Sequence, residues 1–283
     1  MINNPPLNKE PVSIKRALIS VFDKTGVIEL AQELTKLGVE ILSTGGTEKT
    51  LRNAGVIVKD VSEYTNFPEI MDGRVKTINP LIGGGILGLR DQHEKDAIRN
   101  KIDWIDLVVC NLYPFSKTIS KKNCTLGVAL ENIDIGGPTM IRSAAKNLGW
   151  VTIMVEPHDY TTTLNEIRET KKISFKTRKK LSNKAFGHTA KYDTIIHNYL
   201  KDEKLSTDLS LTFKKHSDMR YGENPHQLAA AYVFPGNKEP NITNAIIHQG
   251  KKLSYNNIMD ADGALACVRE FDEIACVIVK HAN

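Results

Sequence analysis

The chain has 283 residues, of which 41% are apolar and 25% charged, and a net charge of +5. This balance is typical of a folded globular protein and excludes global disorder. Apolar runs such as Ile274–Val279 fall far short of the roughly 20 residues of a membrane-spanning helix, and residues 1–16 lack the apolar segment of a secretory signal. Four cysteines without a C-x-x-C pair indicate reduced thiols of a cytoplasmic protein, with no metal site.

The excess positive charge has a local origin. Seven lysines and arginines lie between residues 171 and 184, with no acid among them. Such a cluster could bind nucleic acid, but no recognised binding motif accompanies it. A solvated helix face near a domain junction is the simpler interpretation.

Apolar runs alternate with helical patterns over the first 200 residues. After a flexible tail over residues 1–15, Arg16–Phe22 predicts a buried strand, and the apolar spacing of Val27–Leu37 predicts a helix that Gly38 ends. Further strands are expected at Val39–Leu42, from Val56, at Ile105–Leu112 and at Val151–Val155, and further helices at Thr47–Ala54, Pro138–Asn147, 157–170 and 176–200. This alternation predicts an α/β fold, a parallel sheet flanked by helices.

A second series of elements follows the polar segment Lys201–Ser210. It predicts strands at Ala229–Phe234, Ala245–His248 and Ala275–Val279, and a helix near Asp260–Phe271. We therefore expect two domains, residues 16–203 and 204–283. The second domain stops shortly after its last predicted strand, which would leave the sheet with an unfinished edge.

Two polar loops follow the first two predicted strands, each just before a helix. The first is Ser20–Gly26 and contains Lys24, and the second is Ser43-Thr44-Gly45-Gly46-Thr47. Free N–H groups at a helix start, glycines, hydroxyls and a lysine together suit a phosphate group. Either loop alone is also typical of an ordinary turn with an N-capping threonine, but two in consecutive units predict a phosphate site.

Three further segments carry polar groups. In Arg74-Val75-Lys76-Thr77 the two cations suit an anionic ligand, and Cys110-Asn111-Leu112-Tyr113 offers an amide and a phenol. Asp134-Ile135-Gly136-Gly137 would place a carboxylate near a helix N-terminus, with Arg142 and Lys146 beyond it. Each has an ordinary interpretation as well: a Tyr before Pro usually packs, and Arg142 and Lys146 at i, i+4 form a basic helix face. The neighbouring Ala144-Ala145 would allow Lys146 partial burial, which lowers the pKa of an amine.

Taken in order, these segments resemble one family closely. SVxDKTG, STGGT, DGRVKT, CNLYPF, IDIGGPTxxRSAAKN, RYGENPHQ, LSYNN and VKHAN follow each other as in the bifunctional purine biosynthesis family, most like its bacterial members. Those proteins combine IMP cyclohydrolase with 5-aminoimidazole-4-carboxamide ribonucleotide (AICAR) formyltransferase. The resemblance runs from Arg16 to Asn283. Two positions depart from it, Asn79 where the family usually has His and Phe22 where it often has Ser.

The resemblance implies a methylglyoxal-synthase-like cyclohydrolase over residues 16–203. This domain would close 5-formamido-4-imidazolecarboxamide ribonucleotide (FAICAR) to IMP and water without a cofactor. The implied catalytic residues are Lys76, Asn111, Tyr113, Asp134 and Lys146, with N–H groups near Asp134–Gly136 as an oxyanion hole. The implied nucleotide-binding residues are Phe22, Asp23, Lys24, Ser43, Thr44, Gly45, Gly46, Thr47, Arg74, Thr77, Cys110, Ile135, Gly136 and Gly137.

Residues 204–283 resemble the beginning of the formyltransferase domain, whose cosubstrate is 10-formyltetrahydrofolate. Arg220, Tyr221 and Asn257 would then bind AICAR, and Lys280 and His281 would act in catalysis, in a homodimer when the protein is complete. The family's domain continues well beyond this position. We therefore expect a truncated domain with no folate site, and no formylation by this chain.

Two other functions remain open. One is a methylglyoxal-synthase-like lyase acting on a small phosphate ester, against which CNLYPF and IDIGGPT argue. The other is a non-catalytic nucleotide-binding module, similar to the regulatory domain of carbamoyl-phosphate synthetase, against which the joint presence of Tyr113, Asp134 and Lys146 argues. In each case we expect a small-molecule phosphate ligand, and neither nucleic acid nor a membrane as partner.

Overall fold

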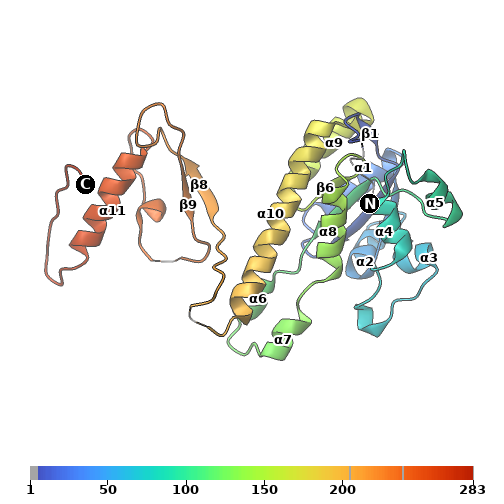
Figure 1. Cartoon of the computed structure of the whole chain (residues 1–283), viewed down its shortest axis with the longest axis horizontal. Coiled ribbons are helices and arrows are strands. Elements are labelled where there is room, and N and C mark those ends of the chain that lie inside the picture. The colour runs from blue at the N-terminus through green and yellow to red at the C-terminus, as the bar shows by residue number, and fades with distance from the viewer. Residues whose placement is uncertain (1–5, 204, 238, 283) are drawn as a thin grey trace. The chain divides into compact units, whose positions relative to one another are not determined.

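The computed structural model describes residues 6–203, 205–237 and 239–282. They form two compact units, Met1–Leu205 and Ser206–Asn283 (Figure 1). Within the described ranges, no helix is both long enough and apolar enough to cross a bilayer. The assignment of two separate functions to domains 16–203 and 204–283 stays a prediction.

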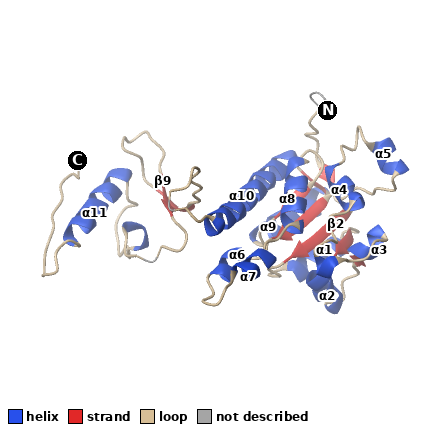
Figure 2. Ribbon diagram, turned by 60° about the horizontal axis from the view of Figure 1, so that its bottom comes forward, coloured by secondary structure: helices blue, strands red, loops and turns tan. Residues whose placement is uncertain are grey.

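A five-stranded parallel sheet forms the centre of the first unit (Figure 2). Its strands lie in the order β4 (Lys59–Asp60), β3 (Glu40–Ser43), β2 (Arg16–Val21), β5 (Leu107–Asn111) and β6 (Thr152–Met154). The register pairs Ser43 with Ile19 and Asn111 with Val21, so the carboxyl ends of β3, β2 and β5 meet at one edge. The predicted α/β fold with a parallel sheet is confirmed.

Helices cover both faces of this sheet. They are α1 (Val27–Lys36), α2 (Gly45–Asn53), α3 (Val61–Thr65), α4 (Pro80–Leu87), α5 (Glu94–Arg99), α6 (Phe115–Ile119), α7 (Leu126–Glu131), α8 (Gly136–Lys146), α9 (His158–Thr170) and α10 (Phe175–Leu200), with a 3₁₀ turn η1 (Met71–Gly73). Side chains alternate along a strand, so Ile19 packs with α1 and α9, whereas Leu18 packs with α4, α8 and α10. The sheet is therefore buried between two apolar cores.

The expected flexible tail over residues 1–15 is in part an ordered strand. Residues 1–5 lie outside the described part of the chain, but β1 (Val12–Ser13) pairs antiparallel with β7 (Lys172–Ile173). Val12 and Ile14 are buried there, which gives these two apolar side chains a reason to fold back. The high content of Pro and Asn in this segment is typical of a loop, so the sequence did not predict the short pairing.

The basic cluster of residues 171–184 divides by environment. Lys171, Lys172, Lys176, Lys179 and Lys180 are exposed, as expected of a solvated face. Arg178 differs, because its side chain is fully buried. Its guanidinium donates to the carbonyls of Leu148 (2.8 Å), Ile173 (2.5 Å), Glu10 (2.9 Å) and Gly149 (3.1 Å). It thereby joins the N-terminal segment to β7 and to the turn before β6.

Both tryptophans of the chain belong to the first unit. The Arg90 guanidinium lies 5.5 Å from the ring centroid of Trp150 and pairs with the buried Asp106 at 2.6 Å. Trp104 packs directly on Gly88, where a Cβ would approach its ring to 2.2 Å. Each indole is thus part of the folded structure of this unit.

The second unit consists of a hairpin and one long helix. Strands β8 (Lys214–Asp218) and β9 (Ala230–Val233) pair antiparallel, and η2 (Ile242–Asn244) and α11 (Tyr255–Val268) follow. The predicted strands at Ala245–His248 and Ala275–Val279 are wrong, since neither segment is paired. Ala231 is the one buried apolar residue among those described in this unit. Strand-like composition without a partner strand or a core has not produced a strand.

Candidate active site

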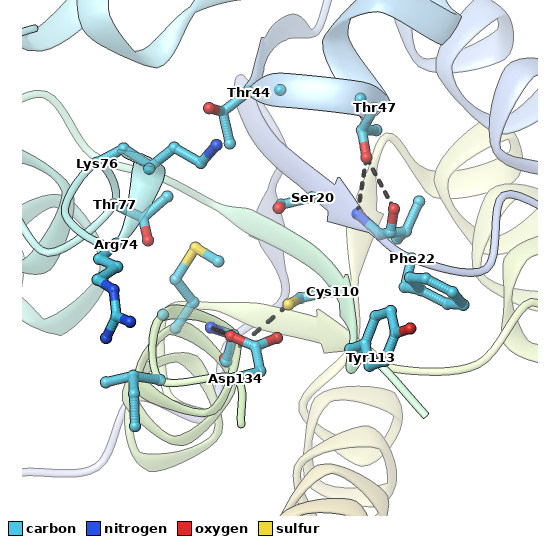
Figure 3. Close-up of a pocket in the computed structure, with 18 of the residues that line it drawn as sticks. Ser20, Phe22, Thr44, Thr47, Arg74, Lys76, Thr77, Cys110, Tyr113 and Asp134 are labelled. Carbon is cyan, nitrogen blue, oxygen red and sulfur yellow. Dashed lines mark hydrogen bonds between the residues drawn. The ribbon is translucent and has the colours of Figure 1, made fainter. Parts of the chain in front are cut away.

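A cavity of about 730 Å³ opens at the carboxyl ends of β2, β3 and β5 (Figure 3). The loops that follow these strands line it, together with residues from η1 to Thr77 and from the loop between α7 and α8. Of the residues predicted to bind or convert a nucleotide, the following line the cavity: Phe22, Lys24, Thr44, Gly45, Gly46, Thr47, Arg74, Lys76, Thr77, Cys110, Asn111, Tyr113, Asp134, Ile135, Gly136 and Gly137.

One side of the cavity is suited to an anion. Helix α2 begins at Gly45, and the first N–H groups of a helix have no partner within it. The side chain of the preceding Thr44 makes no capping hydrogen bond to them. Two lysines reach the same turn: a Cβ at Gly45 would lie 3.1 Å from Lys76 Nζ, and one at Gly46 would lie 3.8 Å from Lys24 Nζ. A helix N-terminus with two ammonium groups beside it is an arrangement that binds phosphate.

The hydroxyls of the same loop serve the protein itself. Thr47 Oγ1 accepts from Val21 N at 3.1 Å and donates to Val21 O at 2.9 Å (Figure 3). Ser43 Oγ donates to Ile19 O at 2.6 Å, and Ser43 does not line the cavity. These bonds hold the start of α2 against β2. The hydroxyl of Ser43 is thus engaged with the neighbouring strand, and its part in nucleotide binding stays a prediction.

Asn111 holds the first loop in place. Its Oδ1 accepts from the N–H groups of Phe22 (2.7 Å) and Asp23 (2.9 Å), and its Nδ2 donates to Asp23 O at 3.0 Å. Through these bonds Asn111 holds the loop that follows β2, and its catalytic role stays a prediction. The Asp23 carboxylate accepts from the Thr25 hydroxyl and N–H, which lowers its pKa, and it lies outside the cavity lining.

Two aromatic rings meet at the end of β5. The centroids of Phe22 and Tyr113 are 4.6 Å apart in an edge-to-face arrangement, and Phe22 is 46% exposed. Phe22 thus forms an apolar wall beside the Tyr113 phenol, where the family often has Ser. Cys110, on the same strand, is buried, and burial raises the pKa of its thiol far above the usual range. That thiol therefore stays neutral.

Asp134 lies across the cavity from α2 (Figure 3). Its Oδ1 accepts from Gly137 N at 2.8 Å, and its own N–H donates to the Tyr192 hydroxyl at 2.8 Å. Burial raises the pKa of the Asp134 carboxyl, and the Gly137 bond opposes that shift in part. Gly137 is required here, since a Cβ would come within 2.4 Å of Asp134 Oδ2. A carboxyl with a raised pKa in a cavity is a candidate for proton transfer.

The segment from Arg74 to Thr77 completes the lining. Arg74 forms an ion pair with Glu131, and Lys76 pairs with Glu69 at 3.1 Å. Glu131 also lines the cavity and was not predicted, because it is 57 positions from its partner Arg74 and no local sequence pattern connects the two. Asn79, where the family usually has His, caps α4 through a bond from Leu81 N at 2.9 Å.

Lys146 lies apart from this group. It is the last residue of α8, ten residues after Gly136, which corresponds to about 15 Å along the helix axis. It is exposed and does not line the cavity, so the expected partial burial is wrong. Ala144 and Ala145 are buried instead, and Lys146 follows them on the solvent side. Its catalytic role rests on the resemblance alone.

In the second unit, the predicted residues gather around the first half of α11. Tyr255 N donates to Tyr221 O at 3.1 Å, and the Arg220 guanidinium lies 4.8 Å from the Tyr221 ring centroid. Asn257 closes a capping box with Ser254. One turn further, Ala282 N donates to Asp260 Oδ1 at 2.8 Å, and the preceding His281 places Nδ1 3.9 Å from Asp260 Oδ2. His281 is 71% exposed, and Lys280 is also exposed.

Comparisons with known proteins match both units. The description MGS-like domain fits residues 26–139, and AICARFT/IMPCHase bienzyme fits residues 144–283. The bifunctional purine biosynthesis protein PurH of Acetivibrio thermocellus is 53% identical to this chain over 276 residues. The chain belongs to the bifunctional purine biosynthesis family. The match covers 95% of this chain and 54% of PurH, so the chain spans about half the length of that relative.

A solved structure supports the fold of this family member. The crystal structure of ForH superimposes with a TM-score of 0.60 at 30% sequence identity, covering 65% of this chain and 95% of the ForH chain. The border between the two sequence matches falls inside α8, whereas the physical border between the compact units follows α10. The second match therefore includes α9 and α10, which pack against the five-stranded sheet of the first unit.

Proposed function

We propose that the first unit is an IMP cyclohydrolase that closes FAICAR to IMP and water. The observation that supports this most is one cavity with an anion site at α2 and a buried carboxyl, Asp134, opposite. A nucleoside monophosphate complements these two features, because its phosphate suits the anion site and its reacting base would lie near the carboxyl. Membership of the bifunctional purine biosynthesis family supports the same reaction.

In the proposed mechanism, the phosphate lies on the N–H groups at Gly45–Thr47 beside Lys24 and Lys76, and Arg74 and Thr77 line the ribose side. The carboxamide nitrogen attacks the formyl carbon and gives up a proton to Asp134. The formyl oxygen gains negative charge and then a proton. The N–H groups of Ile135 and Gly136 are suited to that charge, since those of Asp134 and Gly137 are already engaged.

Loss of water completes the ring. The hydroxyl on the former formyl carbon leaves as water with a proton from the Tyr113 phenol, the candidate donor. The nitrogen that carried the formyl group then loses its proton to the Tyr113 phenolate. Both reacting groups belong to one molecule, so correct positioning can supply much of the rate acceleration. In this scheme Asn111 and Thr47 act by holding the loops that bind the phosphate.

For the second unit we propose a part in AICAR formylation, with 10-formyltetrahydrofolate as cosubstrate, in a protein of the full length of PurH and not in this chain alone. The placement of Arg220, Tyr221 and Asn257 around one end of α11, with Lys280 and His281 one turn away, supports a shared role. Assembly as a homodimer and a cytoplasmic location belong to this proposal.

The decisive experiment measures IMP formation when the purified chain is mixed with FAICAR. We expect turnover well above the spontaneous reaction, and none when dihydroxyacetone phosphate replaces FAICAR. Release of methylglyoxal would instead favour the lyase. Tight binding of IMP in calorimetry without any turnover would favour a non-catalytic nucleotide-binding module.

A further inference from the structure

Tyr192 on α10 makes an unusual connection to the candidate site. Its hydroxyl oxygen accepts the N–H of Asp134 at 2.8 Å, across 58 positions of sequence. Among the described residues, this is the one hydrogen bond that joins the backbone of residues 132–136 to an element other than the flanking helices α7 and α8. We propose that Tyr192 is a positioning residue for Asp134 in the cyclohydrolase reaction, an inference that rests on the proposed function.

The core fixes the Tyr192 ring. Tyr192 is 7% exposed, and its centroid lies 6.4 Å from that of the buried Phe115, at an interplanar angle of 69°. Tyr192 belongs to the apolar core between the sheet, α8 and α10. A phenol held in this way has little freedom to follow a moving loop, so it imposes a position on its hydrogen-bond partner.

Asp134 depends on such an anchor because of where it lies. Helix α7 ends at Glu131 and α8 begins at Gly136, which leaves Asp134 on the connection between them. Gly137 N holds its Oδ1, and Tyr192 holds its main-chain N–H. The other carboxyl oxygen, Oδ2, receives no hydrogen bond from the described residues, and it is therefore the one open to a proton of the substrate.

The bond to Tyr192 also bears on how much water reaches the carboxyl. Burial is the main cause of the raised pKa of Asp134, so a loop that moves outward would lower that pKa toward its ordinary value. The charged groups in the same cavity are Lys24, Asp72, Arg74, Lys76 and Glu131. Cys110 and Tyr113 complete its titratable lining, and Asp193 adjoins Tyr192 on α10. Replacing Tyr192 with Phe removes one hydroxyl and leaves all of these in place.

The test compares Tyr192→Phe with Tyr199→Phe. Tyr199 lies on the same helix and packs on the same Phe115, with centroids 5.6 Å apart, but its hydroxyl is beside Cys124 and makes no hydrogen bond to residues 132–136 among those described. For Tyr192→Phe we expect kcat to fall about tenfold with KM within about twofold, because positioning is lost while phosphate binding is kept. The acid limb of its kcat profile moves to lower pH. Tyr199→Phe keeps the wild-type profile.

Titration of the Asp134 carboxyl by carbon-13 NMR provides a second measurement that needs no turnover. We expect its pKa to be lower in Tyr192→Phe than in wild type and Tyr199→Phe, all three giving the same near-UV circular dichroism. Failure of the wild-type chain to convert FAICAR would refute the proposed function, while the titration would still decide the role of Tyr192. Equal Asp134 titrations overturn the inference. A fall in kcat with no shift of the acid limb also overturns it and leaves Tyr192 a merely structural residue.

Discussion

At the scale of single residues, the cavity shows that side chains of one motif divide into those that face a ligand and those that hold the loops. Asn111 was predicted to act in catalysis and Ser43 to bind the nucleotide, and the side chains of both form hydrogen bonds with the backbone of a neighbouring strand or loop. The sequence places these residues at strand ends, which was enough to predict the site. It could not predict their bonds, because the partners lie 24 to 89 positions away.

Asp134 is the residue whose replacement should have the largest effect on chemistry. Asp134→Asn removes the proton acceptor and should lower kcat by ~10²–10⁴. In the wild type, burial raises the pKa of this carboxyl above the ordinary 3.8. The active carboxylate form is then present above that raised pKa, and kcat falls as the pH drops through it.

Steady-state rates from pH 4 to 8 check this prediction. The apparent pKa of the acid limb should lie above the range of an exposed carboxyl. The residual activity of Asp134→Asn should show no such acid limb. An Asp72→Asn variant is the control, since it removes another carboxyl that lines the same cavity. A wild-type rate in Asp134→Asn would show that a group other than Asp134 accepts the proton of the carboxamide nitrogen.

At the scale of elements, α2 carries the prediction for binding. Lys24→Ala should weaken IMP binding about tenfold, because a hydrogen bond to a charged group contributes about 1.5–3 kcal/mol. The loss should be seen in KM rather than kcat, since the phosphate is remote from the reacting carbon. Lys49→Ala is the matched control, an exposed lysine on α2 outside the cavity lining. If calorimetry gives the same IMP affinity for both variants, the phosphate does not bind at the N-terminal end of α2.

Arg178 carries the prediction for stability. Arg178→Met keeps much of the volume but leaves four carbonyl groups without their donor, so we expect the free energy of unfolding to fall by about 3 kcal/mol. The exposed neighbour Lys179→Met should change it by less than about 0.5 kcal/mol. Urea unfolding measures both. If both changes lower the free energy of unfolding by a similar, small amount, water must be able to replace the guanidinium as the donor to these carbonyls.

The elements that were predicted correctly share a cause. Arg16–Val21 and Leu107–Asn111 are apolar on both faces, and such runs have one stable location, a sheet covered on both sides. The segments at Ala245–His248 and Ala275–Val279 have similar composition but no neighbour to pair with. Local pattern decides whether a segment can become a strand, and partners elsewhere in the chain decide whether it does.

At the scale of the whole molecule, the two units differ in how much they bury. The first has two apolar cores, whereas residues such as Leu228, Ile274 and Ile278 of the second are almost fully exposed. This chain should therefore form IMP from FAICAR yet show no formylation of AICAR with 10-formyltetrahydrofolate, because an exposed His281 lacks the enclosure that catalysis needs. Paired assays on one preparation test this. Measurable formylation would show that the site around α11 is sufficient.

Limited proteolysis tests the same division physically. Helix α10 ends at Leu200 and β8 begins at Lys214, so the first cuts should fall between them. The N-terminal fragment should survive and keep its cyclohydrolase activity. Early cuts within the parallel sheet would contradict an independent first unit.

The position of the two tryptophans gives the division an optical consequence. Trp104 and Trp150 both pack inside the first unit, and no indole lies beyond residue 150. Intrinsic fluorescence therefore follows the melting of the parallel sheet alone, while far-ultraviolet circular dichroism also records α11. During a denaturant titration the two signals should separate, with ellipticity lost first and indole emission changing only when the sheet opens.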